Sequence, residues 1–385
     1  MGGSKGRQIK VMHVIARMNV GGPAVEITEL MRGFDPNQIS QRLVTGYVNE
    51  DEADFLETHA LDIEATRIDG LGRSIRPTDD IKVLATLTRM IRASHPDIVH
   101  THTAKAGALG RIAAKAAGTG ARIVHTHHGH LLHGYFGRAK TRVVIELERQ
   151  LSKITDRIIT VGDKVRDDLL EVGIGRPEQY TVIRSGVRLG SIPDKATARR
   201  ELGLPHDKVI VSMIGRLTKI KRPDRFADVA EMARDWNLNV HFIVAGGGEE
   251  ERALRDRVER SGLPVTMLGW RSDVERVLAA SDAVLLTSDS EGTPLSLVQA
   301  GLGGLAVVAT NVGAVGEVVL SDRSGILVEP EVTPLVVAIQ TLAVSLAMRE
   351  KMGAQGRLHA AATFGPARFL RAHQELYRGV VHESP

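Results

Sequence analysis

Short apolar segments alternate with amphipathic segments along nearly the whole chain, and this alternation limits its possible folds more than any other feature. The apolar segments predict strands at 9–16, 41–48, 97–103, 121–129, 156–162, 208–217, 239–248, 264–270, 282–288 and 305–313. The amphipathic segments predict helices at 24–34, from about 79, and at 107–118, 141–154, 223–236, 249–262, 273–281, 294–302 and 365–381. Strands that alternate with helices form a parallel sheet with helices on both faces. The sequence therefore predicts an α/β protein.

The alternating pattern restarts after a segment near 186–206 that is rich in glycine, proline and charge. Such a composition is typical of a domain boundary, and 385 residues are too many for one ordinary hydrophobic core. We therefore expect two doubly wound domains, at 1–190 and 191–365. The last segment, 366–385, is expected to form an amphipathic helix.

Composition excludes several classes of function. Hydrophobic residues make up 43% and charged residues 25%, as in a globular protein, and the net charge of +4 is too small to indicate nucleic-acid binding. The chain has no cysteine, which excludes disulfides, thiolate zinc sites and a cysteine nucleophile. No apolar run is long enough to span a membrane, and the start does not resemble a secretory signal. We expect a cytoplasmic protein.

Ligands of doubly wound sheets bind beyond the carboxyl ends of the strands, so the residues after each strand are the candidates for a site. Gly21 and Gly22 follow the first strand and allow close approach to the backbone and to a helix N-terminus. They do not form a Gly-X-Gly-X-X-Gly motif, and a tight turn without function explains them equally well. Arg216 and Lys221, with Arg222 beside them, follow the first strand of the second half. Two cations there suit a diphosphate, and the alternative is a surface cluster.

A glycine-rich turn at 245–248 is followed by three glutamates at 249–251. Backbone N–H groups in such a turn can bind phosphate, but the glutamates would repel an anion. Acidic residues are favourable in the first turn of any helix, because they face its positive end. We therefore interpret 245–254 as an ordinary helix start.

The segment SEGTPLSLVQ, at 290–299, contains a second candidate for an anion site. Thr293 is predicted to cap a helix whose first residue is Pro294. The backbone N–H groups of Ser296 and Leu297 would then have no partner within the helix and would face an anion. A plain capped helix explains the segment equally well.

A carboxylate and an amide flank this helix start. Glu291 comes before the helix and can accept hydrogen bonds from hydroxyl groups, and Gln299 lies inside the helix. Together with an anion site, these groups fit a polyol joined to a phosphate, such as a nucleotide sugar.

The first half of the chain contains ten of the fifteen histidines. Strand alternation places His100 with His102, and His125 with His127, on common faces. A metal site is one interpretation, but no carboxylate stands at the spacings usual for zinc catalysis and no His-Glu-X-X-His motif is present. We favour hydrogen bonds to a polar substrate, with several histidines in structural roles, and predict no metal.

These segments together resemble family 4 of the glycosyltransferases. In the second half the resemblance is carried by GRLTKIKRPDRF, LGWRSDVERVLAASDAVLLTSDSEGTPLSLVQA and VVATNVGAVGEVV. In the first half RPTDDIKVL, PDIVHTHTAKAGALGRIAAKAAG, HTHHGHLLHGYF and YTVIRSGV are similar to bacterial members that build cell-surface polysaccharides. The resemblance implies the GT-B architecture, in which two Rossmann-like domains face each other and the last helix packs back on the first domain.

The resemblance also implies an activity: metal-independent, retaining transfer of a sugar from a nucleotide sugar, usually a UDP-sugar, with no cofactor. It implies that Arg216 and Lys221 hold the diphosphate and that Glu291 and His128 contact the donor sugar near the reaction centre, with His127 as the alternative to His128. The remaining donor-binding residues that it implies are Gly21, Gly22, Gly292, Thr293, Pro294, Ser296, Leu297 and Gln299.

Gln299 departs from the family pattern, which has a glutamate that binds the ribose hydroxyls at this place. An amide still accepts a hydrogen bond but lacks the charge. A charged hydrogen bond contributes about 1.5–3 kcal/mol and a neutral one about 0.5–1.5 kcal/mol. The difference of roughly 1 kcal/mol weakens binding by nearly tenfold without abolishing it.

The acceptor is expected on the first domain, lined by Arg73, Lys105, His127, His130 and the loop 129–138. The basic, partly amphipathic segment 137–153 fits a polyprenyl-diphosphate-linked acceptor at the inner face of the plasma membrane. An ordinary packed helix with a charged outer face is the alternative.

Two other functions remain open at this point. A non-catalytic nucleotide-sugar-binding protein would fit Gln299 and the segment GLGGLAVV at 301–308. An epimerase of nucleotide sugars has the same architecture, although the Glu291 segment and the Arg216/Lys221 pair fit a transferase better.

Overall fold

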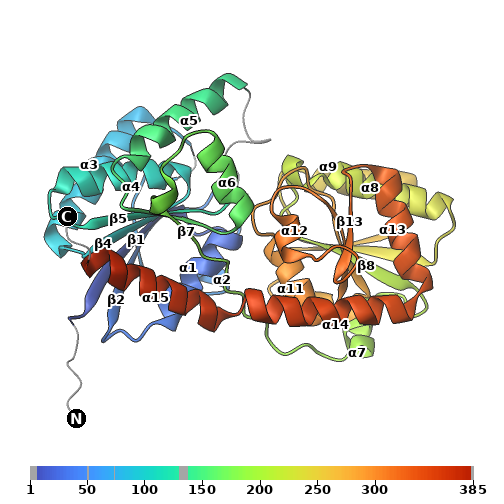
Figure 1. Ribbon diagram of the computed structural model, residues 1–385. Coiled ribbons are helices and arrows are strands. Elements are labelled where there is room, and N and C mark those ends of the chain that lie inside the picture. Colours follow the sequence, from blue (N-terminus) through green and yellow to red (C-terminus); the bar gives the residue numbers. More distant parts are fainter. Residues whose placement is uncertain (1–6, 50–51, 73, 130–137, 383–385) are drawn as a thin grey trace, which may run out of the picture. The chain divides into compact units, whose positions relative to one another are not determined.

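The computed structural model describes residues 7–49, 52–72, 74–129 and 138–382. The chain divides into two compact units. Unit 1 comprises residues 1–186 together with 366–385, and unit 2 comprises residues 187–365. The last helix, α15 (Pro366–His382), thus packs with the first unit of the chain (Figure 1).

Unit 1 contains a parallel sheet of seven strands in the order β3-β2-β1-β4-β5-β6-β7. The strands are β1 (Ile9–Arg17), β2 (Ile39–Gly46), β3 (Ala65–Arg67), β4 (Ile98–His102), β5 (Arg122–His127), β6 (Arg157–Thr160) and β7 (Tyr180–Val182). The order reverses between β1 and β4, so a topological switch point lies there. The central strands are nearly continuous runs of buried residues, as expected of a parallel sheet covered on both faces.

Helices of unit 1 cover both faces of this sheet (Figure 1). They are α1 (Gly22–Gly33), α2 (Phe55–Thr58), α3 (Pro77–Ser94), α4 (Ala104–Ala117), α5 (Arg138–Ser152), α6 (Asp163–Glu171) and α15. On one face Val11 packs with Leu30 of α1 and Phe369 of α15. On the other face Val14 packs with apolar residues of α3 and α4 such as Leu87. Because successive side chains of β1 point to opposite faces of the sheet, this strand contributes to two separate hydrophobic cores.

Unit 2 contains a parallel sheet of six strands in the order β10-β9-β8-β11-β12-β13, which reverses between β8 and β11. Its strands are β8 (Val209–Ile214), β9 (Val240–Ala245), β10 (Val265–Gly269), β11 (Ala283–Leu286), β12 (Ala306–Thr310) and β13 (Gly325–Val328). Its helices are α7 (Lys195–Glu201), α8 (Pro223–Asp235), α9 (Glu251–Ser261), α10 (Val274–Ala280), α11 (Leu295–Gly303), α12 (Val315–Val318), α13 (Val332–Val344) and α14 (Leu346–Thr363). The prediction of parallel α/β sheets is confirmed in both units.

The structure differs from the sequence prediction mainly at short elements and at element ends. The predicted strand 41–48 is observed at Ile39–Gly46, because the chain leaves the sheet before Tyr47, whose side chain is exposed and lies under the guanidinium of Arg67. The domain boundaries of unit 1 and unit 2 lie at 186/187 and 365/366, against the predicted 190/191 and 365/366.

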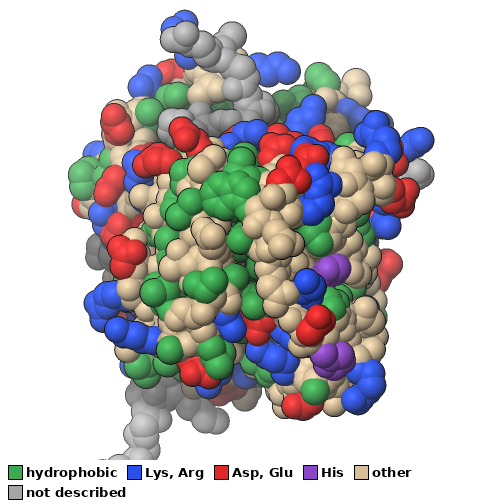
Figure 2. Space-filling view, turned by 90° about the vertical axis from the view of Figure 1, so that its right-hand side faces the viewer, with side chains coloured by type: hydrophobic (Ala, Val, Ile, Leu, Met, Phe, Trp, Pro, Cys, Tyr) green, Lys and Arg blue, Asp and Glu red, His purple; other side chains and the backbone are tan. Residues whose placement is uncertain are grey.

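No single helix in the described part of the chain is long and apolar enough to cross a membrane. Within the described residues, α13 and the helices over Leu346–His382 reach the length and apolar content of a membrane span only when they are taken together, as a bent pair. α13 is apolar because residues such as Leu335 and Ile339 pack in the core of unit 2. Figure 2 shows basic and acidic side chains interspersed over the face of the molecule that it presents, without a continuous basic patch on that face.

Candidate active site

The residues predicted to bind the donor follow the two strands that flank the switch point of unit 2. Arg216 and Lys221 lie between β8 and α8, and Glu291 lies between β11 and α11. Because both strands are parallel neighbours, their carboxyl ends open at the same edge of the sheet. Residues 70 positions apart in the sequence are thereby brought together.

Lys221 and Glu291 form an ion pair at this edge. Nζ of Lys221 lies 2.5 Å from Oε1 of Glu291, and the hydroxyl of Ser288 donates to the same oxygen at 2.5 Å. Glu291 is only 8% exposed, so its charge depends on these two donors. Among the described residues, no hydrogen bond uses Oε2 of Glu291, which leaves that oxygen available to a hydroxyl group of a ligand.

The backbone around this pair is held from both sides. The hydroxyl of Thr287 donates to the carbonyl of Lys221 at 2.9 Å, and the N–H of Ala314 donates to the carbonyl of Glu291 at 3.0 Å. Gly313 has a φ of +54°, and a Cβ at this position would lie 2.0 Å from the Glu291 carbonyl oxygen. Only glycine therefore allows the β12–α12 turn to approach Glu291 this closely.

The two arginines near Lys221 differ in their surroundings. Arg222 is bound by Asp224 at 2.7 Å and Asp289 at 3.2 Å, and the hydrogen bonds with Asp224 raise the pKa of Arg222. Arg222 therefore stabilises the loop, and its guanidinium is not available to bind an anion. Arg216 lies partly buried two residues after β8.

The start of α11 differs from the prediction. Pro294 is the N-cap residue instead of the first helical residue, and no side chain caps the helix, so the predicted cap by Thr293 is wrong. The N–H of Leu297 donates to the carbonyl of Pro294 at 2.9 Å, so its predicted open amide is also wrong. Leu295 and Ser296 are the first residues of α11, and their N–H groups have no acceptor within the helix. The candidate anion-binding end is therefore shifted by one residue.

Two other donor-binding candidates lie on the same segment. Gly292 is partly exposed directly after Glu291, and Gln299 is partly exposed within α11. Within the described residues the side-chain amide of Gln299 makes no hydrogen bond. Its donors and acceptor are thus available to a ligand.

The turn after β9 is a packing feature. Gly246 has a φ of +148°, and a Cβ there would lie 1.9 Å from the carbonyl oxygen of Gly215. Close approach of two strand-end loops therefore accounts for the glycine. Glu251, in the first turn of α9, is paired with Arg255 at 2.9 Å, which agrees with our interpretation of 245–254 as an ordinary helix start.

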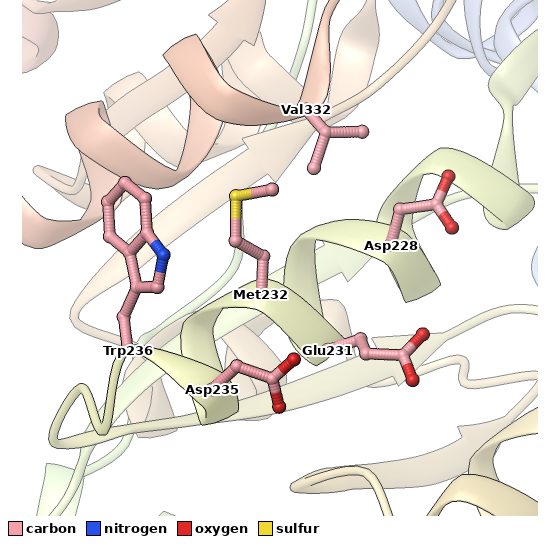
Figure 3. Close-up of a pocket in the computed structure, with 6 residues that line it drawn as sticks. All are labelled: Asp228, Glu231, Met232, Asp235, Trp236 and Val332. Atoms are coloured by element: carbon pink, nitrogen blue, oxygen red, sulfur yellow. The ribbon is translucent and has the colours of Figure 1, made fainter.

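A surface hollow of unit 2 lies elsewhere (Figure 3). Its volume is about 400 Å³, and it is lined by Asp228, Glu231, Met232, Asp235, Trp236 and Val332. These residues belong to the middle and end of α8, the residue that follows it and the start of α13, whereas the candidate site adjoins the first turn of α8. Arg257 lies 2.7 Å from both Asp228 and Glu231 and neutralises much of the acidic wall. The hollow is therefore separate from the residues that could hold a nucleotide sugar.

In unit 1 the predicted glycines begin α1. Gly21 is the N-cap and Gly22 the first residue of the helix, and both are partly exposed. The preceding loop is held by an ion pair between Arg17 and Glu52 at 2.5 Å and by the N–H of Val20, which donates to a backbone carbonyl of the 52–55 segment. A fixed loop with a helix N-terminus suits the binding of an anionic ligand.

The histidines of unit 1 lie on opposite faces of the sheet. His100 and His102 share the face covered by α1 and α15, as the predicted alternation requires. His125 and His127 share the other face, next to α4 and α5. His128, beyond the end of β5, is on the first face and lies 3.1 Å from His102. The sequence alone predicted which histidines share a face but not that the two pairs are separated.

Hydrogen bonds satisfy both ring nitrogens of His13, His100 and His102 on the first face. His100 contacts the hydroxyl of Tyr377 in α15 and that of Thr126, each at 2.7 Å. Burial lowers the pKa of His100 well below its usual range, so this side chain is neutral. His13, His100 and His102 are close enough to hold a metal ion, but their hydrogen bonds account for them without one.

The second face contains a buried ion pair that the sequence did not indicate. Arg111 of α4 donates from Nη2 to both carboxylate oxygens of Glu148 of α5 at 2.8 Å, and both side chains are at most 3% exposed. His125, His127 and Glu148 are placed so that they could hold a metal ion. The adjacent guanidinium opposes a cation there, because like charges at this distance repel strongly in a buried site.

Two of the acceptor-side candidates, Lys105 and His127, lie within the described residues. Lys105 donates to the carbonyls of Gly70 and Ser74 at 2.9 and 2.6 Å, and it is paired with Asp80 at 2.6 Å. It therefore links the backbone at Gly70 and Ser74 to α3. His127 is buried, with 3% of its surface exposed, so little of it is accessible to an acceptor in this structure.

Other acceptor-side candidates fall outside the described residues. They are Arg73, His130 and the part of the loop 129–138 that spans 130–137.

Glu26 is a candidate residue that the sequence analysis missed. It lies in α1, is 5% exposed, and its Oε2 is 3.2 Å from Nδ1 of His128. The hydroxyl of Ser185 donates to its other oxygen. The only local signal for this residue is its place on the buried face of a helix that follows a glycine turn. Its partners, His128 and Ser185, are distant in the sequence.

Comparisons with known proteins agree with this geometry. The family model "Glycosyl transferase 4-like domain" matches residues 21–186, and "Glycosyl transferases group 1" matches residues 194–359. The chain is 31% identical over 276 residues to a UDP-Gal:α-D-GlcNAc-diphosphoundecaprenol α-1,3-galactosyltransferase of Escherichia coli, covering 69% of this chain and 71% of that protein.

Solved structures show the same fold at lower identity. The chain matches a sucrose-phosphate synthase of Thermosynechococcus elongatus with a TM-score of 0.83 and 20% identity, over 98% of this chain and 100% of the other. It matches Anabaena HepE in complex with UDP and glucose with a TM-score of 0.81 and 21% identity, over 97% and 100%.

Two Rossmann-like parallel sheets with polar residues at their switch points define a GT-B protein. The chain belongs to the glycosyl transferases of group 1 with a 4-like first domain, and it is a hexosyltransferase-type glycosyltransferase. The resemblance to family 4 is thereby confirmed, and an enzyme replaces the alternative of a non-catalytic binding protein.

Proposed function

We propose that the enzyme transfers a sugar from a UDP-sugar to a hydroxyl group of a lipid-linked glycan, with retention of configuration and without a metal ion. The observation that carries this proposal is the Lys221–Glu291 pair at the switch point of unit 2. A relative whose name specifies a UDP-sugar donor and a diphosphoundecaprenol-linked acceptor supports the two substrate classes. An acceptor of this kind fits the biosynthesis of cell-envelope polysaccharides.

The donor chemistry follows from the charges at this edge of the sheet. When the bond between the sugar and the diphosphate breaks, negative charge develops on the phosphate oxygens. Lys221, Arg216 and the open amides of Leu295 and Ser296 supply fixed positive ends that stabilise this charge. Oε2 of Glu291 accepts a hydrogen bond from a hydroxyl group of the sugar and orients it.

The same groups replace a metal ion in the proposed reaction. The sequence has no Asp-X-Asp pair of the kind that binds the metal of a nucleotide sugar. The acceptor oxygen forms the new bond to the anomeric carbon on the face from which the diphosphate departs. The departing phosphate takes the proton of the acceptor hydroxyl, so that the products are UDP and the glycosylated acceptor.

Transfer assays with UDP-galactose and a diphospholipid-linked N-acetylglucosamine test the proposal. We expect UDP release that depends on the acceptor, an α-linked product by NMR, and full activity in EDTA. Parallel assays with GDP- and ADP-sugars serve as controls. Activity that is lost in EDTA and restored by magnesium would contradict metal independence, and release of an epimerised sugar without acceptor would identify an epimerase.

Replacement of Gln299 by glutamate is expected to strengthen UDP binding by about tenfold, because a charged acceptor on the ribose contributes roughly 1 kcal/mol more than a neutral one. Titration calorimetry with UDP measures the change. UMP binding should strengthen by the same factor, because the ribose is common to both. Unchanged or weaker binding would show that Gln299 does not contact the ribose.

Peripheral membrane contact through α5 is the remaining part of the proposal. Lys140, Arg142, Val143 and Leu147 are exposed on this helix, which fits attraction to anionic headgroups of about 1 kcal/mol per basic residue. Co-sedimentation with phosphatidylglycerol vesicles is expected to fall several-fold in Arg142→Glu and not in the control Lys153→Glu. Equal loss in both variants, or no binding of the unaltered enzyme at low salt, would remove α5 as a membrane contact.

A further inference from the structure

A continuous series of polar side chains leads through the core of unit 1 to His128. This histidine chain consists of Gln41, His13, His102, His128 and Glu26. Nε2 of His13 lies 3.0 Å from Oε1 of Gln41, and Nδ1 of His13 lies 3.3 Å from Nε2 of His102. Nδ1 of His102 lies 3.1 Å from Nε2 of His128, whose Nδ1 lies 3.2 Å from Glu26.

The orientation of Gln41 gives the histidine chain a direction. Its Nε2 group donates to the carbonyl of Leu30 at 2.8 Å, which turns its Oε1 toward His13. A carbonyl oxygen can only accept, so Nε2 of His13 must carry a hydrogen. The tautomer of His13 is thus set by an amide that α1 itself holds in place.

Burial transmits this direction to the next rings. It lowers the pKa of His13 to about 4, so His13 is neutral and its Nδ1 has no hydrogen. Nδ1 therefore accepts from Nε2 of His102. Burial, reinforced by the neighbouring His100, holds the pKa of His102 well below its usual range. His102 is neutral as well, and its Nδ1 accepts from Nε2 of His128.

The direction has a consequence at the end of the series. With the hydrogen of Nε2 directed to His102, an unprotonated Nδ1 of His128 would face the carboxylate of Glu26 at 3.2 Å. Two acceptors at this distance repel, so a proton must lie between them. The hydroxyl of Ser185 donates to the other oxygen of Glu26 and fixes the carboxylate.

We propose that Gln41 and His13 are positioning residues of the transferase: through the histidine chain they hold His128 with one hydrogen on Nε2 and a second proton shared between Nδ1 and Glu26. Nδ1 has no aligned hydrogen bond in the structure and is buried. The shared proton and the bond to His102 therefore fix the orientation of the His128 ring. This inference rests on the proposed function and on the contact between His128 and the donor sugar that the resemblance to family 4 implies.

NMR of the enzyme labelled with ¹⁵N in histidine tests the proton positions without any substrate. We expect His13 and His102 as neutral Nε2–H tautomers and His128 with protons associated with both nitrogens. The variant Gln41→Met keeps the side-chain length and removes the acceptor of His13. It is expected to change the resonances of all three histidines and to lower kcat by about tenfold, with little change in KM for the donor.

His125→Gln is the control, because His125 is nearly as buried as His13 but bonds to Thr101 on the opposite face. It should leave the three resonances and kcat within twofold of the unaltered enzyme. An Nδ1–H tautomer for His13 or His102 would overturn the inference, as would unchanged spectra and kcat in Gln41→Met. Failure of the unaltered enzyme to use a UDP-sugar would instead contradict the proposed function, because the spectra do not depend on the donor.

Discussion

Replacement of Lys221 by methionine is expected to lower kcat/KM by about 10²–10³-fold, because the fixed positive charge that stabilises the departing diphosphate is lost. Methionine has nearly the same length, so packing around the side chain is kept. The loss should appear mainly in kcat, since the charge is greatest in the transition state. Steady-state release of UDP from a UDP-sugar, with acceptor present, measures it.

Loss of Lys221 also leaves Glu291 buried with Ser288 as its remaining side-chain donor among the described residues, so stability must be measured beside activity. The double variant Lys221→Met/Glu291→Gln removes this unpaired charge and is expected to recover the melting temperature without recovering kcat. Lys219, exposed in the same short 3-10 helix, provides the control Lys219→Met. If Lys219→Met lowers activity as much, or Lys221→Met keeps more than a tenth of it, the proposed role of Lys221 is wrong.

The central strands of both sheets could be predicted because buried parallel strands are nearly continuous apolar runs. Elements without that signal were missed. The edge strand β3 (Ala65–Arg67) has only three residues, which are not fully buried. α14 packs Gly356 and Ala360 against Gly301 of α11, so its contact with that helix uses small residues that hydrophobic periodicity does not detect.

The candidate site was predictable where one local segment carries the chemistry. Glu291 and the residues of the α11 start are adjacent in sequence, whereas the one-residue shift of the cap depends on the bond from Leu297 to Pro294. The histidine chain was not predictable, because the donors and acceptors of His13 and His128 come from Gln41 and Glu26 on other elements. Alternation along a strand fixes which face a histidine occupies, but only tertiary packing determines its partner.

Replacement of Arg111 by leucine is expected to destabilise unit 1 by about 3–5 kcal/mol, because it leaves the carboxylate of Glu148 buried without its cation. Nε of Arg111 also donates to the carbonyl of Gly107 at 2.9 Å. Burial lowers the pKa of Arg111, while the adjacent Glu148 opposes this shift. Burial lowers the pKa of His127, 3.9 Å from Glu148, to about 4, so this histidine is neutral beside the intact ion pair.

Urea unfolding followed by two signals assigns the effect of Arg111→Leu to unit 1. Both tryptophans, Trp236 and Trp270, lie in unit 2, so their fluorescence reports that unit, whereas circular dichroism reports helices of both. The double variant Arg111→Leu/Glu148→Leu should recover most of the lost stability, because two apolar side chains of similar volume leave no charge buried. Glu146→Gln, which breaks an exposed ion pair with Arg149 on the same helix, should change little. A double variant no more stable than Arg111→Leu would show that the loss comes from packing or from the Gly107 bond and not from the stranded carboxylate.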